Sequence, residues 1–151
     1  MWKQLIAVST ASVLLSACGA GSPVLRSPTT GELAPCPSSP HCVSSLATNE
    51  RHAIEPLRYV GSPVAAREKL ARVLGRMASL GYAVVLSEGD YLRATHTSKR
   101  MKYVDDMEFV FSQSQVGVIH VRSSSRIGYA DGGANRRHVE EVRRAFDVAK
   151  S

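Results

Sequence analysis

The sequence predicts an α+β fold of two layers, in which an antiparallel sheet of four to five strands carries two helices on one face. Two long segments, near residues 63–80 and 135–149, show the apolar repeat of amphipathic helices. Five β-type runs lie before and between them, which gives the order β-α-β-β-β-β-α. An antiparallel sheet with both helices on the same face is the simplest arrangement that buries both apolar stripes.

The two helices have recognisable starts and inner faces. Ser62 is a suitable N-cap, Pro63 suits the first helical position, and Gly81 provides a stop. The second helix begins at about Gly132 or Asn135. The residues predicted to face the core are Leu70, Val73, Leu74 and Met77 in the first helix, and Val139, Val142, Phe146 and Ala149 in the second.

The strand runs cover residues 52–60, 82–86, 91–97, 103–111 and 117–127, with a hairpin turn at 88–90. A register can be predicted for the last two runs, because one pairing puts their apolar residues on one face and opposite charges on the other. That register pairs Phe111 with Gly117, Phe109 with Ile119, Met107 with Val121, Glu108 with His120, Asp106 with Arg122, and Asp105 with Ser123.

Length and charge limit the classes of function. The 151 residues suffice for one ordinary domain, and a net charge of +6 favours anionic partners. Lysine and arginine are spread along the chain, and only 6% of the residues are aromatic, so the sequence lacks the basic, base-stacking surface of a nucleic-acid-binding protein. We therefore expect no nucleic-acid partner.

The first residues indicate export and lipidation. Residues 1–17 have the positive start and short apolar stretch of a signal peptide, too short to span a bilayer. Residues 15–19, LSACG, resemble the lipobox of bacterial lipoproteins, which implies a diacylglycerol and an acyl chain such as palmitate on Cys18. Gly19 is similar to the sorting pattern for the outer membrane, facing the periplasm. An ordinary signal peptide cleaved near Ala17 or Ala20 is the alternative.

Residues 18–35 are rich in proline and glycine and are expected to form a lipidated, flexible tether before a single domain at 36–151. With Cys18 lipidated, Cys36 and Cys42 remain, and an oxidising compartment favours a disulfide between them. The alternative is a metal site that uses both cysteines together with His41 and a borrowed His52.

Three segments then support a family resemblance: residues 34–47 (APCPSSPHCVSSLA), 103–111 (YVDDMEFVF) and 121–143 (VRSSSRIGYADGGANRRHVEEVR). In this order and spacing they resemble the uncharacterised family of domain of unknown function 1499. The resemblance implies one small envelope-associated or organelle-associated domain, and it implies no particular activity.

The most polar stretch, residues 122–137, joins the last strand to the last helix. Hydroxyls, arginines and the unpaired amides of a helix start together suit an anion, a lipid headgroup or phosphate included. The residues of this predicted anion site are Ser123, Ser125, Arg122, Arg126, Asn135 and Arg136, with Arg137 nearby. The alternative is a purely structural network, in which Asp105 and Asp106 pair with neighbours and Asp131 caps the helix.

Catalysis is a third hypothesis. Asp105, Asp106 and Glu108 are close in sequence and His96 and His120 could act as bases, but adjacent strand residues point to opposite faces. The sequence contains none of the common nucleophile, phosphate-loop or zinc-protease motifs. We therefore expect a non-catalytic binding or interaction module, with no metal or cofactor, bound to an anionic ligand or an envelope protein. The alternative is a hydrolase that uses Asp105 on an anionic substrate.

Overall fold

The computed structural model describes residue 23 and residues 25–150. The predicted signal peptide, residues 1–17, and Cys18 therefore lie outside the described residues. Within the described part of the chain, no helix combines the length and the apolar character needed to cross a membrane.

Six antiparallel strands form one sheet, in the spatial order β1-β6-β5-β4-β3, and the short β2 also pairs with β6. The predicted α+β class is confirmed. The run expected at residues 52–60 is strand only at residues 57–58, apart from an isolated bridge at Ala53, and β1 was not predicted. The strands are β1 (Cys42–Ser44), β2 (Leu57–Arg58), β3 (Tyr82–Glu88), β4 (Tyr91–Thr97), β5 (Val104–Phe111) and β6 (Val118–Ser125).

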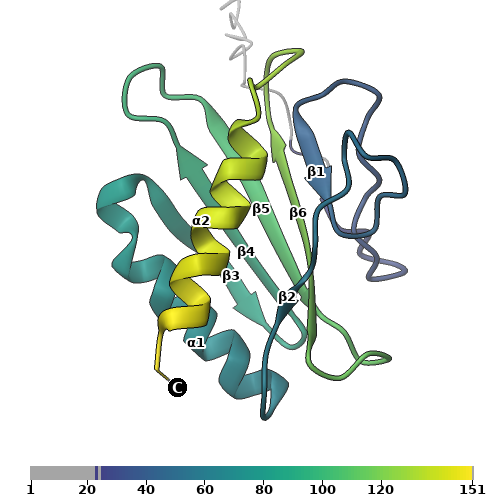
Figure 1. Ribbon diagram of the computed structural model, residues 1–151, viewed down its shortest axis with the longest axis vertical. Coiled ribbons are helices and arrows are strands. Elements are labelled where there is room, and N and C mark those ends of the chain that lie inside the picture. The colour runs from purple at the N-terminus through teal and green to yellow at the C-terminus, as the bar shows by residue number, and fades with distance from the viewer. Residues whose placement is uncertain (1–22, 24, 151) are drawn as a thin grey trace, which may run out of the picture.

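Both helices lie on the same face of the sheet (Figure 1). Helix α1 (Pro63–Arg76) begins as predicted, since the Ser62 hydroxyl accepts a hydrogen bond from the Ala65 amide at 3.1 Å. A short 3₁₀ turn, η1 (Ala78–Leu80), follows and ends at Gly81, whose φ of 107° suits glycine. Helix α2 (Ala134–Val148) starts between the two predicted positions.

The core fills the space between the helices and the sheet. The apolar stripes of both helices are buried there as the periodicity predicted, and each fully buried aliphatic or aromatic side chain contributes roughly 1.5–3 kcal/mol. The central core residues are Leu70, Val73 and Leu74 from α1, Val139, Val142 and Phe146 from α2, and Leu92, Met107, Phe109, Phe111, Ile119 and Val121 from the sheet.

The predicted register of β5 and β6 is wrong by two residues. Phe111 pairs with Ile119, Glu108 with Arg122, Asp106 with Ser124, and Asp105 with Ser125. A shift of two keeps every side chain on its predicted face, because strand side chains alternate with a period of two. The observed register instead brings Glu108 to Arg122, with 3.3 Å between Oε2 and Nη1 in a pair that is almost fully buried.

The disulfide between Cys36 and Cys42 is confirmed, with 5.6 Å between the Cα atoms. Both thiols are therefore used, and the alternative metal site that required them is wrong. His52 has a structural role instead, because its Nδ1 hydrogen-bonds the Cys42 carbonyl at 2.8 Å.

Part of the predicted tether packs against the domain. The Arg26 amide donates to Glu108 Oε1 at 2.6 Å, its guanidinium pairs with Asp90 at 2.9 Å, and Leu33 is buried. The contact with Glu108 lies on the sheet face opposite the helices, because Glu108 alternates with the core residues of β5. Part of residues 25–35 therefore contacts the domain, and the flexible tether stays a prediction; residues 18–22 and 24 lie outside the described residues.

We predict that Glu108→Ala lowers the free energy of unfolding by about 3–5 kcal/mol, because it removes one member of a buried ion pair. It also removes the acceptor of the Tyr91 hydroxyl and of the Arg26 amide. Urea unfolding measures the change, and Glu88→Ala, at an exposed carboxylate on β3, is the matched control. A loss below about 1 kcal/mol would show that the buried pair does not hold the sheet.

Candidate functional site

A hydrogen-bonded polar corner forms where β5 and β6 meet the start of α2, on the face that carries the helices. We define it by five residues: Asp105, Ser123, Ser125, Asp131 and Asn135. Asn135 is fully buried and joins the others. Its Oδ1 accepts from Ser123 Oγ at 2.5 Å, and its Nδ2 donates to Ser125 Oγ at 2.9 Å and to Asp131 Oδ2 at 2.8 Å.

The disulfide loop also enters this corner, through the backbone carbonyl of His41. That oxygen accepts from Asn135 Nδ2 at 3.0 Å and from the Ser125 amide at 3.1 Å. Two segments about 90 residues apart in sequence are thus joined by one buried side chain. The Cys36–Cys42 loop therefore belongs structurally to the corner.

Asp131 closes the amino end of α2. Its carboxylate accepts from the Gly133 amide at 2.9 Å and from the Asn135 amide at 2.8 Å. Partial burial acts against the charge, but these hydrogen bonds hold the pKa of Asp131 below its ordinary value. At least two amides at the helix start are therefore already satisfied by the protein's own carboxylate.

The structure brings together only part of the predicted anion site. Ser123, Ser125 and Asn135 meet in the polar corner, whereas Arg122 and Arg126 lie on the opposite face of the sheet. There Arg122 pairs with Glu108, and Arg126 donates to both oxygens of Asp106 at 2.7 and 3.0 Å.

The third arginine of the predicted set is also separate. Arg136 donates to the Arg51 carbonyl at 3.2 Å on the surface. In this structure the serines and the arginines of the predicted set make contacts in different places. Anion binding by the complete set stays a prediction.

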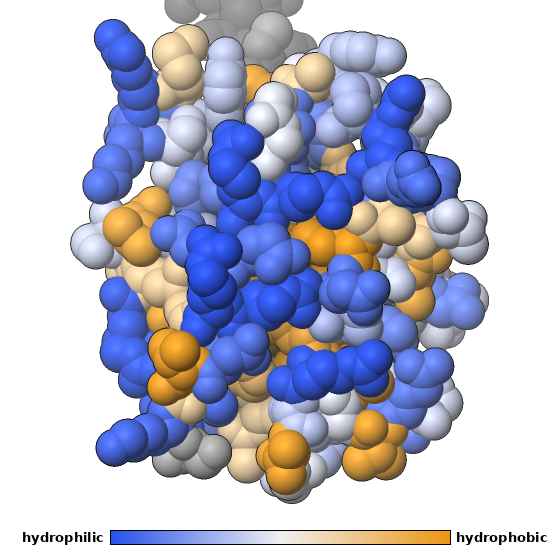
Figure 2. Space-filling view, viewed as in Figure 1, coloured by the Kyte–Doolittle hydropathy of each residue, from blue (hydrophilic) through white to orange (hydrophobic). Residues whose placement is uncertain are grey.

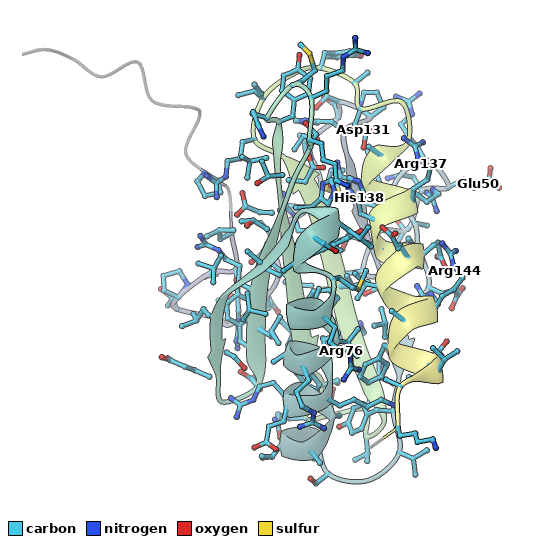
Figure 3. The ribbon with its side chains drawn as sticks, turned by 90° about the vertical axis from the view of Figure 1, so that its left-hand side faces the viewer. Glu50, Arg76, Asp131, Arg137, His138 and Arg144 are labelled. Atoms are coloured by element: carbon cyan, nitrogen blue, oxygen red, sulfur yellow. A yellow bond between two sulfur atoms is a disulfide. The ribbon has the colours of Figure 1, made fainter. Side chains whose placement is uncertain are left out.

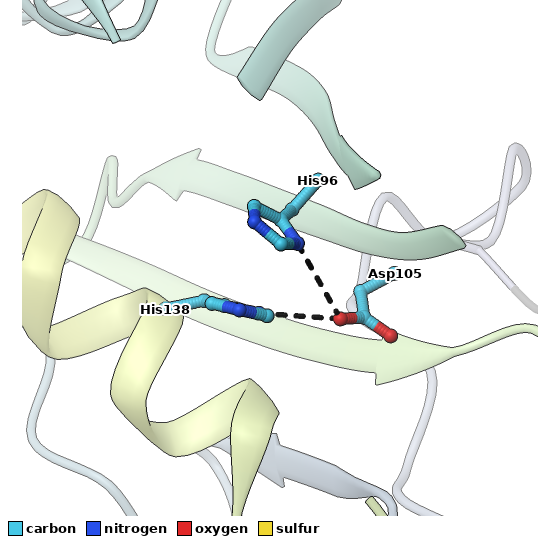
Figure 4. Close-up of side chains that lie close together, drawn as sticks. All are labelled: His96, Asp105 and His138. Atoms are coloured by element: carbon cyan, nitrogen blue, oxygen red, sulfur yellow. Dashed lines mark ion pairs between the residues drawn. The ribbon is translucent and has the colours of Figure 1, made fainter. Parts of the chain in front are cut away.

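A second cluster adjoins the polar corner and shares Asp105 with it. We call His96, Asp105 and His138 the histidine cluster (Figure 4). Asp105 Oδ2 lies 3.2 Å from His138 Nδ1 and 3.9 Å from His96 Nδ1, and the two imidazole rings are 3.7 Å apart between centroids. Three elements supply it: β4, β5 and α2.

Local structure explains this convergence. His96 and Asp105 are direct partners in the β4–β5 ladder, so their side chains share one face. His138 lies one turn after Asn135, whose contacts fix the start of α2. The Tyr82 ring packs edge-on against His96 at 4.8 Å, and its hydroxyl donates to Glu141 at 2.6 Å.

Burial lowers the pKa of His96, and the neighbouring His138 lowers it further, while Asp105 acts in the opposite direction. The neutral imidazole is therefore favoured, and a neutral imidazole is the form that ligates metals. Within the described part of the chain, the histidine cluster is the group of imidazoles and carboxylates whose geometry suits a metal ion.

A cavity of about 450 Å³ opens beside the histidine cluster, and we call it the corner cavity. Asp131, Arg137 and His138 lie together at the start of α2 and line it (Figure 3). Around it, hydrophilic side chains cover much of the helix side of the molecule, with apolar surface in separate patches between them (Figure 2). The cavity therefore borders the whole histidine cluster and, of the polar corner, Asp105, Ser125 and Asp131.

A second cavity, of about 370 Å³, lies on the other face of the sheet and is lined by Asp106, Arg122 and Arg126, among others. Its charged side chains are the paired ones described above, so they are already neutralised by protein groups. Asp105 and Asp106 thus face different cavities, as the alternation along a strand predicted.

His138 was not singled out from the sequence. It adjoins Val139 on the predicted inner face of α2, and its distance from His96 and Asp105 along the chain gives no local spacing motif. The cluster could have been predicted only by combining two features of the sequence. The pairing of the strands places residues 96 and 105 side by side, and the apolar face of the last helix places residue 138 near the same edge of the core.

Comparison with known proteins identifies the family. The model of the family described as Protein of unknown function (DUF1499) matches residues 32–146. The chain belongs to this family. No curated protein and no solved structure matches the chain. Membership in DUF1499 supplies no activity.

We predict that Asn135→Ala lowers the free energy of unfolding by about 2–3 kcal/mol, because the Ser123 hydroxyl and the His41 carbonyl lose a buried partner. Chemical denaturation measures the effect, and Gln113→Ala, in an exposed loop, should change stability by less than about 0.5 kcal/mol. Unchanged stability with a lost response to phosphate would instead favour the anion-site hypothesis for this corner.

Proposed function

We propose that this chain is a lipid-anchored protein of a bacterial cell envelope whose domain binds a small ligand in the corner cavity. The anchor is supported by the lipobox-like residues 15–18 and by the short apolar stretch before them. Gly19 favours the outer membrane, with the domain in the periplasm. The disulfide fits that compartment, because structural disulfides persist in oxidising surroundings.

The corner cavity is the observation that best supports a role in ligand binding. Its volume of about 450 Å³ is within the range of small-molecule sites, and titratable side chains converge on one wall. A purely structural network would satisfy its own polar groups. In the histidine cluster, by contrast, the Nδ1 atoms of His96 and His138 are buried without a hydrogen-bond partner.

The charges of the cavity indicate which ligands it favours. Asp105 and Asp131 line it against Arg137, and burial keeps His96 largely neutral, so the lining does not attract a bare anion. A cationic or polar ligand fits directly. An anion would bind there only after a cation has supplied positive charge.

We predict that the exported chain carries lipid on Cys18. Intact-mass measurement of the protein extracted from membranes should give residues 18–151 plus a diacylglyceryl group and an acyl chain, and Cys18→Ala should remove this modification and the membrane association. An unmodified mass that begins near Cys18 or Gly21 would instead establish the ordinary signal peptide.

We predict that Ala130→Trp, at the rim of the corner cavity, blocks ligand binding without unfolding the domain. The test is a library of small polar fragments, monitored through the imidazole ¹⁵N resonances of His96 and His138 in the detergent-solubilised mature chain. Ala65→Trp, at an exposed helical position beside another cavity, is the matched control and should bind like the wild type. Fragments that leave both histidines unshifted in the wild type would contradict the binding role.

A further inference from the structure

We propose that the histidine cluster binds one divalent first-row transition-metal ion through Nδ1 of His96, Nδ1 of His138 and a carboxylate oxygen of Asp105. This inference rests on the proposed function, because it names the ligand class of the corner cavity. Two imidazoles and one carboxylate form a donor set that suits zinc and iron(II), and zinc is the probe that we choose.

The positions of the donors support a single shared ion. One donor atom from each of the three residues lies within 4.8 Å of the others. A tetrahedral zinc ion with bonds of about 2.0–2.1 Å places its donors about 3.3 Å apart. The distance of 3.2 Å between His138 Nδ1 and Asp105 Oδ2 already matches this, and the distance of 3.9 Å from His96 Nδ1 to Asp105 Oδ2 has to shorten by about 0.6 Å when the ion binds.

The unpaired nitrogens point to a missing partner. His96 is 9% exposed, and its ring hydrogen-bonds the backbone of Leu80 while its Nε2 lies beside Gly81. The opposite nitrogen, Nδ1, then presents a lone pair towards Asp105 Oδ2, where no hydrogen bond forms. A lone pair and a carboxylate that face each other in a buried site repel unless a cation lies between them.

The surroundings hold the carboxylate in a ligating orientation. Ser125 Oγ donates to Asp105 Oδ1 at 2.5 Å, which leaves Oδ2 directed at the two imidazoles. Ser125 is held in turn by Asn135 and by the backbone of the disulfide loop. Outer contacts of this kind orient metal ligands and raise the affinity of the site.

The corner cavity leaves the fourth coordination position open. Three protein ligands with one position facing solvent are the arrangement of zinc sites that accept water or a small ligand. A divalent ion would give the cluster a net charge of +1, counting one carboxylate and two neutral imidazoles. With Arg137 at the rim, the occupied cavity would accept an anionic ligand, which the unoccupied cavity disfavours.

The experiment uses the lipidated mature chain in detergent, stripped with a chelator and titrated with zinc by calorimetry, with metal content measured by mass spectrometry. We expect one zinc per chain. Asp105→Asn and His138→Gln should each weaken binding by about 100-fold or more, because removing a ligand exceeds the effect of losing an outer contact. His120→Gln, whose ring hydrogen-bonds Ser45 on the other face of the sheet, should bind like the wild type.

A measurement on the wild-type chain covers the case in which the variants do not fold. Zinc should shift the imidazole ¹⁵N resonances of His96 and His138 and leave those of His120 in place, and cobalt(II) should give the visible absorption of a tetrahedral site. Zinc that shifts neither resonance, or that binds equally to the folded Asp105→Asn protein, would overturn the inference.

The two proposals can fail separately. Fragments that shift His96 and His138 in a chain to which zinc does not bind would leave the proposed function standing and overturn the metal site. If neither fragments nor zinc bind at the cavity, both proposals are overturned. A histidine cluster that is only a structural ion pair would give this second result, together with lower stability in Asp105→Asn.

Discussion

Three buried carboxylates on one central strand impose the main constraint on this domain. Asp105, Asp106 and Glu108 of β5 are 5%, 2% and 0% exposed. A buried carboxylate is tolerated only where hydrogen bonds or opposite charges replace its water. The partners come from β4, β6, α2 and the segment before the disulfide, so these elements are held in place by the same requirement.

The two faces of β5 meet this requirement in different ways. Glu108 and Asp106 face away from the helices and pair with arginines, whose charge is permanent. Asp105 faces the core side, where it accepts a hydrogen bond from a serine hydroxyl and lies beside two imidazoles, groups that commonly ligate metals. The first arrangement suits a structural role, and the second suits binding chemistry beside a cavity.

The sequence predicted the parts of the fold that depend on local periodicity. Both helices and the faces of β5 and β6 followed from apolar spacing, but the register did not. The predicted pairing of Asp106 with Arg122 and the observed pairing of Glu108 with Arg122 both join opposite charges on the same face, so charge could not decide between them. The packing of residues 25–35 depends on long-range contacts of Arg26, which leave no periodic signal.

That two-residue difference in register also determines the site. In the predicted register Asp105 would lie opposite Ser123, two residues before the end of β6. In the observed register Asp105 lies opposite Ser125, and Ser123 lies opposite Met107, from where it donates to Asn135 instead. One hydroxyl then orients the carboxylate and the other anchors the helix that carries His138. The histidine cluster therefore exists because strand pairing and helix start are connected through Asn135, a relation that no single segment of the sequence contains.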